Sequence, residues 1–174
     1  MCAFGLARFA ALHQAAEADR GPRGPRYDLC VGIQEILDGL LAETDASRAT
    51  LRQDVPGETF PVTHEALASG VPSIRGVETP NMAGQPVVLA VTAGRQMVQD
   101  DCAELYPADE AFHEMRALYG GLRAQIVTPV VAGERIVAIV SVHQLAAPRT
   151  WSADAVGACS RAAARISALL GRRG

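Results

Sequence analysis

The stretch AQIVTPVVAGERIVAIVSVH, residues 124–143, decides the fold of this protein. Two runs rich in valine and isoleucine, 124–131 and 136–143, flank the short segment Ala132-Gly133-Glu134-Arg135. β-branched residues favour extended backbone, and a glycine in a short link between two such runs is typical of a hairpin. The sequence therefore predicts two antiparallel strands joined by a tight turn.

A helix is predicted directly after this hairpin. Trp151-Ser152 precedes the helical segment, and the Ser152 hydroxyl is a suitable N-cap because it can accept a hydrogen bond from the first turn. Apolar side chains then recur every three or four residues, as one buried helix face requires, at Val156, Cys159, Ala163, Ile166 and Leu170.

The residues before the hairpin predict further helices and strands. Helical spacing marks 28–43, with Asp28 as its N-cap, and the remaining predicted elements are strands at 46–52 and 59–64, a short helix plus loop at 65–84, a helix at 85–93, a strand at 95–100 and a helix at 108–118. This order predicts an α/β (α+β) fold with one central sheet. The outer helices would pack on one face, and the irregular crossings would enclose a ligand cavity on the other.

Two regions are expected along the chain. Residues 1–27 combine an alanine-rich helix at 3–19 with a hinge at 20–26, which glycine and proline prevent from continuing the helix. Residues 28–171 form the main domain. A chain of 174 residues fits one hydrophobic core of this kind.

Composition limits the classes of partner. The net charge of −3 argues against a nucleic-acid ligand, which needs a basic face. No apolar run reaches the ~20 residues of a membrane span, and the N-terminus lacks the basic start of a secretory signal. The cysteines at 2, 30, 102 and 159 have no zinc-ligand spacing, so we expect free thiols in the cytoplasm. The sequence requires neither a metal nor a cofactor.

Three segments resemble the GAF domain family. These are LAVTAGRQMVQD at 89–100, the hairpin at 124–142, and RTWS at 149–152, which leads into the last helix. The resemblance covers about 28–170, and Ala138 stands where the family usually has glycine. It implies an antiparallel sheet with terminal helices on one face, a ligand pocket on the other, and a homodimer formed through the terminal helices.

The better-known GAF chemistries are not matched by this chain. The motif of the cyclic-nucleotide type contains lysine, and this sequence has none. The bilin-binding type uses a cysteine in a different sequence context from Asp101-Cys102-Ala103. The methionine sulfoxide reductase type needs a cluster of cysteines, whereas Cys102 has no nearby partner in the sequence.

Candidate ligand contacts lie on the hairpin strands. By strand alternation His143 shares a face with Ser141, and Arg123 shares a face with Gln125. Together they could hold a carboxylate or carbonyl group, and His143 could also act as a base or bind haem iron. The alternatives are a rim histidine bonded to a backbone carbonyl and an exposed Arg–Gln pair.

The segment Asp100-Asp101-Cys102 and Tyr119 complete the candidate set. Adjacent strand residues point to opposite faces, so the two carboxylates are not a paired acid and base. One is expected to cap the following turn rather than face the pocket. Tyr119 precedes Gly120-Gly121, which suits either a mobile lid or a helix C-cap followed by a turn.

These features predict a stand-alone, cytoplasmic, homodimeric GAF-type sensor that binds a small anionic or aromatic metabolite. Its expected ligand-binding residues are His143, Arg123, Gln125, Asp100, Ser141 and Tyr119. The alternative is an isomerase, hydrolase or thiol redox enzyme on the same scaffold. In that case His143 would be the base, Asp100 or Asp101 would orient it, and Cys102 would supply the thiol. A purely structural subunit with a filled pocket is a third possibility.

Overall fold

The structure is a computed structural model that describes residues 25–54, 60–79 and 84–171. The predicted helix at 3–19 and most of the predicted hinge at 20–26 lie outside these ranges. Contacts divide the chain into two compact units, Met1–Val31 and Gly32–Gly174, and helix α2 runs through the division. The sheet and its core belong to the second unit.

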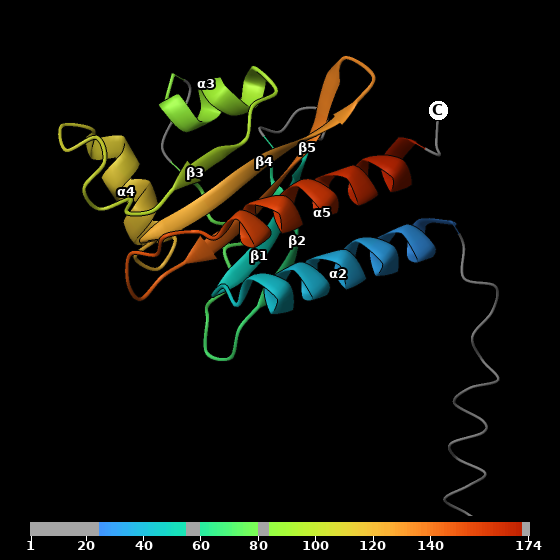
Figure 1. The fold of residues 1–174 in the computed structure, drawn as a ribbon, viewed down its shortest axis with the longest axis horizontal. Helices are drawn as coiled ribbons and strands as arrows, with labels where there is room; N and C mark the ends of the chain where they lie inside the picture. The colour runs from blue at the N-terminus through green and yellow to red at the C-terminus, as the bar shows by residue number, and fades with distance from the viewer. Residues whose placement is uncertain (1–24, 55–59, 80–83, 172–174) are drawn as a thin grey trace, which may run out of the picture. The chain divides into compact units, whose positions relative to one another are not determined.

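A five-stranded antiparallel sheet carries the fold, with strand order β2-β1-β5-β4-β3 (Figure 1). This confirms the predicted α+β class. The elements are α2 (Pro25–Thr44), β1 (Arg48–Gln53), β2 (Val62–Leu67), α3 (Pro86–Thr92), β3 (Met97–Gln99), α4 (Glu110–Leu118), β4 (Ala124–Ala132), β5 (Arg135–Gln144) and α5 (Ala153–Gly171).

The predicted hairpin is confirmed as β4–β5, at the middle of the sheet. Ala132 pairs with Arg135, so the turn is tighter than the sequence predicted and consists of Gly133 and Glu134. Gly133 has a φ of 63°, which explains the glycine at this position. Ser152 is confirmed as the N-cap residue of α5, because its hydroxyl accepts a hydrogen bond from the Ala155 backbone N–H at 3.1 Å.

Two local predictions were wrong. Helix α2 begins at Pro25, so Asp28 lies in its first turn and is not the N-cap. Proline is tolerated there because its missing N–H would have no helical partner. Residues 65–67 belong to β2, and the described residues 68–79 form turns and loop instead of a short helix. Gly70 and Gly76 have positive φ there, which a helix does not allow.

Residues 32–44 of α2 and helix α5 lie side by side in Figure 1, with Gly32 against Leu169 and Glu43 paired with Arg161, and they cover one face of the sheet. Gln96 identifies that face, because its side-chain amide donates both to Thr128 Oγ1 of β4 and to the Val156 carbonyl of α5. The apolar side chains between sheet and helices are fully or nearly fully buried: Ile33, Leu37, Leu40, Ala49, Leu51, Ile126, Val140, Val142, Cys159 and Ile166. This layer is the main core.

The opposite face of the sheet carries a smaller apolar cluster. It joins α4 to the loops around it and contains Val62, Ile74, Cys102, Phe112, Met115, Tyr119 and Leu122. None of the described helices is both long and apolar enough to cross a membrane. Polar side chains from the strands share this second face, and they form the candidate site.

Candidate functional site

The candidate site is a set of polar side chains in two neighbouring rows on the sheet face opposite α5, and we call it the polar sheet face. Strand register defines the rows. The first row crosses four strands through Arg48, His143, Gln125 and Gln99. The second contains Thr50 and Ser141, and Arg52 follows on β1. These strands bring residues from distant parts of the sequence into one plane.

Arg48 is fully buried, with 0% of its surface exposed. Its Nε donates to His143 Nδ1 at 3.2 Å, while Nη1 and Nη2 donate to the carbonyls of Pro72 and Tyr119, each at 2.9 Å. All three acceptors are neutral. Burial lowers the pKa of Arg48, and the Glu65 carboxylate partly opposes this. Glu65 itself bonds to the loop at residues 73–74 and not to the guanidinium.

His143 is 3% exposed and is held in one neutral form. Burial lowers its pKa well below the ordinary value, and the charges of Arg48 and then Arg52 lower it further. Because Nδ1 accepts a hydrogen bond from Arg48, the single ring proton must lie on Nε2. The imidazole therefore offers a donor N–H at Nε2, and while this bond persists Nε2 has no lone pair for a substrate proton or an iron ion.

Arg52 and Tyr119 form the centre of the site. Arg52 is half-buried; its Nη1 donates to the Phe60 carbonyl at 2.8 Å, and its Nη2 donates to the Tyr119 hydroxyl. The Tyr119 ring centroid lies 5.8 Å from Arg48 Cζ, 5.7 Å from Arg52 Cζ and 5.7 Å from the His143 ring. Among the described residues, no carboxylate forms an ion pair with either arginine.

The second row contains an unpaired hydroxyl. Thr50 is 1% exposed, and its Oγ1 has no hydrogen-bond partner among the described residues. Ser141 is its cross-strand neighbour on β5 and is also buried. An unpaired buried hydroxyl costs about 1–3 kcal/mol, so this position favours an additional polar group on the sheet.

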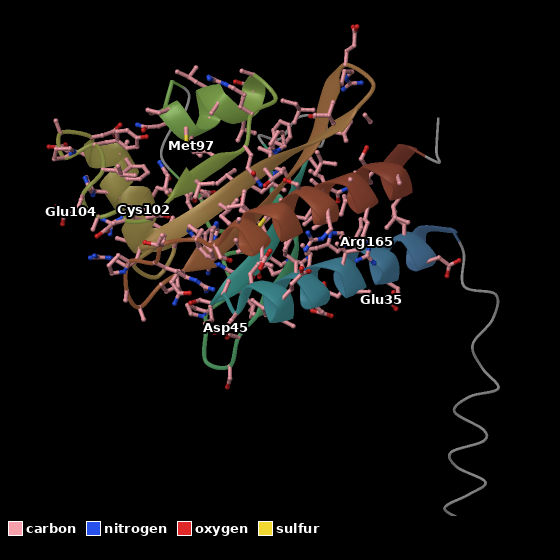
Figure 2. The ribbon with its side chains drawn as sticks, viewed as in Figure 1. Glu35, Asp45, Met97, Cys102, Glu104 and Arg165 are labelled. Atoms are coloured by element: carbon pink, nitrogen blue, oxygen red, sulfur yellow. The ribbon has the colours of Figure 1, made fainter. Side chains whose placement is uncertain are left out.

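A chain of hydrogen bonds between side-chain amides extends the site towards β3. Gln125 Nε2 donates to Gln99 Oε1 at 2.5 Å, and Gln99 Nε2 donates to the Tyr106 hydroxyl at 3.3 Å. Cys102, labelled in Figure 2, lies in the segment from β3 to α4, with Sγ 3.8 Å from Gln99 Oε1. Burial raises the pKa of its thiol to about 12. At neutral pH it is therefore a protonated thiol and a poor nucleophile.

The structure brings His143, Gln125, Ser141 and Tyr119 together but leaves the other candidates at the end of the sheet. Arg123 precedes β4, so strand alternation does not determine the direction of its side chain, and it pairs with Asp101 at 2.9 Å. Asp100 is exposed, and its Oδ1 accepts a hydrogen bond from the Trp151 N–H at 3.3 Å. The capping alternative is met by Asp101 instead, because its Oδ1 accepts a hydrogen bond from the Ala103 N–H of the following turn at 2.9 Å. In the described ranges, no group of three or more His, Cys, Asp or Glu side chains could hold a metal ion.

Sequence reasoning did not select Arg48, Thr50 and Arg52. The available signal was their alternation with Ala49 and Leu51 in the strand predicted at 46–52. Charged residues are almost never fully buried unless paired. Two arginines and a threonine on one side of a strand in a sheet covered on both faces therefore indicate a polar site.

Comparison with known proteins identifies the class. The sequence pattern of the GAF domain family matches residues 28–170. The chain belongs to the GAF domain family, whose members are sensor domains that bind small molecules or chromophores. No curated protein sequence matches the chain.

Solved structures with the same fold include cyanobacteriochrome photoreceptor domains. The cyanobacteriochrome receptor PixJ has a TM-score of 0.73 at 20% identity, covering 87% of this chain and all of its own. The blue-light-absorbing form of the Thermosynechococcus elongatus PixJ GAF domain gives 0.73 at 21% identity, over 85% and 88%. The photoproduct state of a GAF3 domain from Synechocystis sp. PCC6803 gives 0.70 at 15%, over 83% and 94%. At these identities the likeness concerns the fold alone.

Proposed function

We propose that the polar sheet face binds a small organic anion and that the protein acts as a sensor of it. The observation that supports this most is the pair of guanidinium groups, Arg48 and Arg52, on one sheet face without a carboxylate partner among the described residues. A buried positive charge is costly unless it is paired. A bound anion would supply the missing partner.

Arg52 is the proposed anchor for the anion. It is less buried than Arg48, and a guanidinium group can bind a carboxylate through two parallel hydrogen bonds. The hydroxyls of Thr50 and Ser141 would bind further ligand oxygens, and His143 would donate from Nε2. Arg48 would act by holding His143 in its donor form. Arg123 was the anchor that the sequence suggested, but its guanidinium already pairs with Asp101.

Binding is favoured over catalysis by the state of the two reactive side chains. His143 is a neutral donor whose Nδ1 is occupied by Arg48. Cys102 is a fully buried thiol with a raised pKa. An isomerase or hydrolase needs an accessible base, and redox chemistry needs an accessible thiolate. In line with the family resemblance, we propose that the sensor is a cytoplasmic homodimer formed through α2 and α5.

The test is a thermal-shift screen of small carboxylates and phosphates against the wild-type protein and Arg52→Met. A ligand that binds only the folded state stabilises it by ~2.7 kcal/mol at about 100 times its Kd. We expect at least one carboxylate to raise the Tm. For Arg52→Met we expect an affinity about 10–100-fold lower, because a hydrogen bond to a charged group is lost.

The matched control is Arg135→Met. Arg135 is exposed at the hairpin and pairs with Asp54 at 3.2 Å, away from the polar sheet face. The Arg135→Met substitution removes one positive charge, as Arg52→Met does, and leaves the site intact. An anion that binds wild type and Arg52→Met with equal affinity would contradict the proposal, and so would a complete absence of anion binding.

A further inference from the structure

The Tyr119 side chain occupies the centre of the polar sheet face. Its ring centroid lies 5.8 Å from Arg48 Cζ, 5.7 Å from Arg52 Cζ and 5.7 Å from the centroid of the His143 ring. Its hydroxyl accepts a hydrogen bond from Arg52 Nη2. Tyr119 comes from the end of α4, whereas the groups that hold it come from β1 and β5. The sheet thus already binds one aromatic ring that carries an oxygen.

This contact has the chemistry of a ligand complex. The guanidinium groups approach the ring at distances where cations attract an aromatic face, and the hydroxyl oxygen satisfies a donor of Arg52. A carboxylate on an aromatic ring would satisfy the same donor better, because it carries the opposite charge and accepts two bonds. A free aromatic acid could therefore replace the tyrosine side chain.

We infer that Tyr119 is an internal occupant of the ligand site, and that the ligand is a small aromatic carboxylate that displaces it. This inference rests on the proposed function, which it narrows to one ligand class. The carboxylate takes the place of the Tyr119 hydroxyl on Arg52, and the ring takes the place of the phenol. Ligand and tyrosine exclude one another, so the occupant lowers the apparent affinity and sets the concentration that the sensor detects.

The backbone beside Tyr119 can accommodate the exchange. Tyr119 is the C-cap of α4, and Gly120 and Gly121 follow it, each with a φ of 78°. Glycine adopts this conformation without steric cost, and the N–H groups of Gly120 and Gly121 donate to the carbonyls of Ala117 and Arg116, so the end of α4 is closed without the Tyr119 side chain. The Tyr119 carbonyl stays fixed by Arg48 Nη2 at 2.9 Å, so the side chain is the part expected to move. Displacement of this ring would transmit ligand binding to α4.

The test uses benzoate as the probe and cyclohexanecarboxylate as a probe of equal charge without an aromatic ring. Calorimetric titration compares wild type with Tyr119→Phe, which keeps the ring but removes the hydroxyl from Arg52. We expect benzoate to bind Tyr119→Phe about 10-fold more tightly than wild type, a difference of ~1.4 kcal/mol. Tyr106→Phe is the matched control, because its hydroxyl bonds to Gln99 and not to Arg52.

A second readout follows the tyrosine itself. The chain has three tyrosines, so fluorotyrosine labelling gives a short ¹⁹F spectrum in which Tyr119→Phe identifies the Tyr119 signal. Benzoate should move that signal from a buried to a solvent-exposed environment and leave the Tyr106 signal in place. Unlike a change in affinity alone, this shift would not follow from a merely structural tyrosine.

The outcomes separate this inference from the proposed function. If benzoate binding requires Arg52 but the Tyr119 signal stays buried, or if Tyr119→Phe leaves the affinity unchanged, internal occupancy is wrong and anion binding stands. If cyclohexanecarboxylate binds as tightly as benzoate, the ligand is not specifically aromatic. The same conclusion follows if benzoate binds neither wild type nor Tyr119→Phe while another anion binds through Arg52. Either result overturns the aromatic class alone. Loss of all anion binding overturns both.

Discussion

The bond from Arg48 to His143 joins two residues that would each be unfavourable alone at this depth. A buried arginine needs acceptors for its donors, and a buried histidine needs to remain neutral. Here the imidazole lone pair satisfies one donor of the guanidinium, and the guanidinium charge keeps the imidazole unprotonated. The pair therefore fixes the tautomer of His143, so that this residue of the first row offers a donor N–H at Nε2.

The lowered pKa of His143 predicts a pH dependence of stability. Near its ordinary pKa of 6.5 the histidine of the unfolded chain takes up a proton, whereas the folded form does not. Its contribution to the free energy of unfolding is therefore complete above that pH and falls as the pH drops below it. His143→Gln keeps an acceptor for Arg48 and should flatten the slope measured by urea unfolding between about pH 5 and about pH 8.

His64 is the comparison for this experiment. Burial and then the nearby charge of Arg75 lower its pKa too, so its effect has the same sign. It is only partly buried, so His64→Gln should flatten the slope less than His143→Gln. Equal slopes in wild type and His143→Gln would show that the pKa of His143 is not lowered in the folded protein.

Labelling of the cysteine thiols tests whether Cys102 is accessible for redox chemistry. In the described ranges Cys30 is exposed, while Cys102 and Cys159 are buried, each with a pKa raised to about 12 mainly by burial. With Cys2 replaced by serine, a maleimide should label Cys30 alone in the native protein and all three thiols in urea. Mass spectrometry reads out the labelled sites. Rapid labelling of native Cys102 would revive the thiol redox alternative.

At the scale of elements, Arg149 ties the C-terminal end of α2 to the segment before α5. Its Nη2 donates to the Thr44 carbonyl at 2.6 Å, and its Nη1 donates to the Asp45 carbonyl at 2.8 Å. Asp45, labelled in Figure 2, has a φ of 48° and turns the chain from α2 into β1. The last turn of α2 has no basic residue of its own, so Arg149 supplies the positive charge that a helix C-terminus favours.

Removing this tether should weaken the helical layer. Arg149→Ala leaves the helix carbonyls without their donors and removes the guanidinium from the face of Trp151, 4.6 Å away. We expect a loss of about 1.5–3 kcal/mol in the free energy of unfolding, as for other hydrogen bonds to charged groups. Chemical denaturation measures it. Arg95→Ala, at an exposed arginine, is the control and should be neutral within about 0.5 kcal/mol.

At the scale of the whole domain, the two faces of the sheet have different roles. The face under α2 and α5 is an apolar core, whereas the face under α4 combines an apolar cluster with the polar sheet face. The first face stabilises the domain, and the second is the one proposed to bind. Signals in such an arrangement would pass through the sheet to α5, which packs directly on β4 and β5.

The proposed homodimer is tested on the outer surface of α5. Ala164 and Ala168 are exposed there, one turn apart. Light scattering of the wild-type protein should give twice the chain mass of 18.3 kDa. Ala164→Glu together with Ala168→Glu should reduce the mass to that of one chain, because four carboxylates would meet at the interface. Ala117→Glu, at an exposed position of α4, should leave it unchanged. A monomeric wild type would disprove this part of the proposal.

Local sequence patterns predicted most elements and the faces of the central strands. The valine-rich runs around Gly133 favoured a hairpin, and alternation correctly placed Ser141 and His143 on one side of β5, to which the pairing of β4 with β5 adds Gln125. Prediction failed where alternation does not apply. Arg123 lies just outside β4, and residues 65–67 extend β2 because the backbone of β1 is available to pair with them.

The sequence by itself determined the family, the antiparallel sheet and the presence of polar side chains on its strands. Only the tertiary structure decided which of them meet. Arg48 and the Tyr119 carbonyl are hydrogen-bonded across a separation of 71 residues, and Arg48 reaches His143 across 95. Period-two alternation fixes the side of the sheet on which a residue lies, but it is a local property. The protonation of His143 and the position of Tyr119 follow from contacts between elements that become neighbours only when the chain folds.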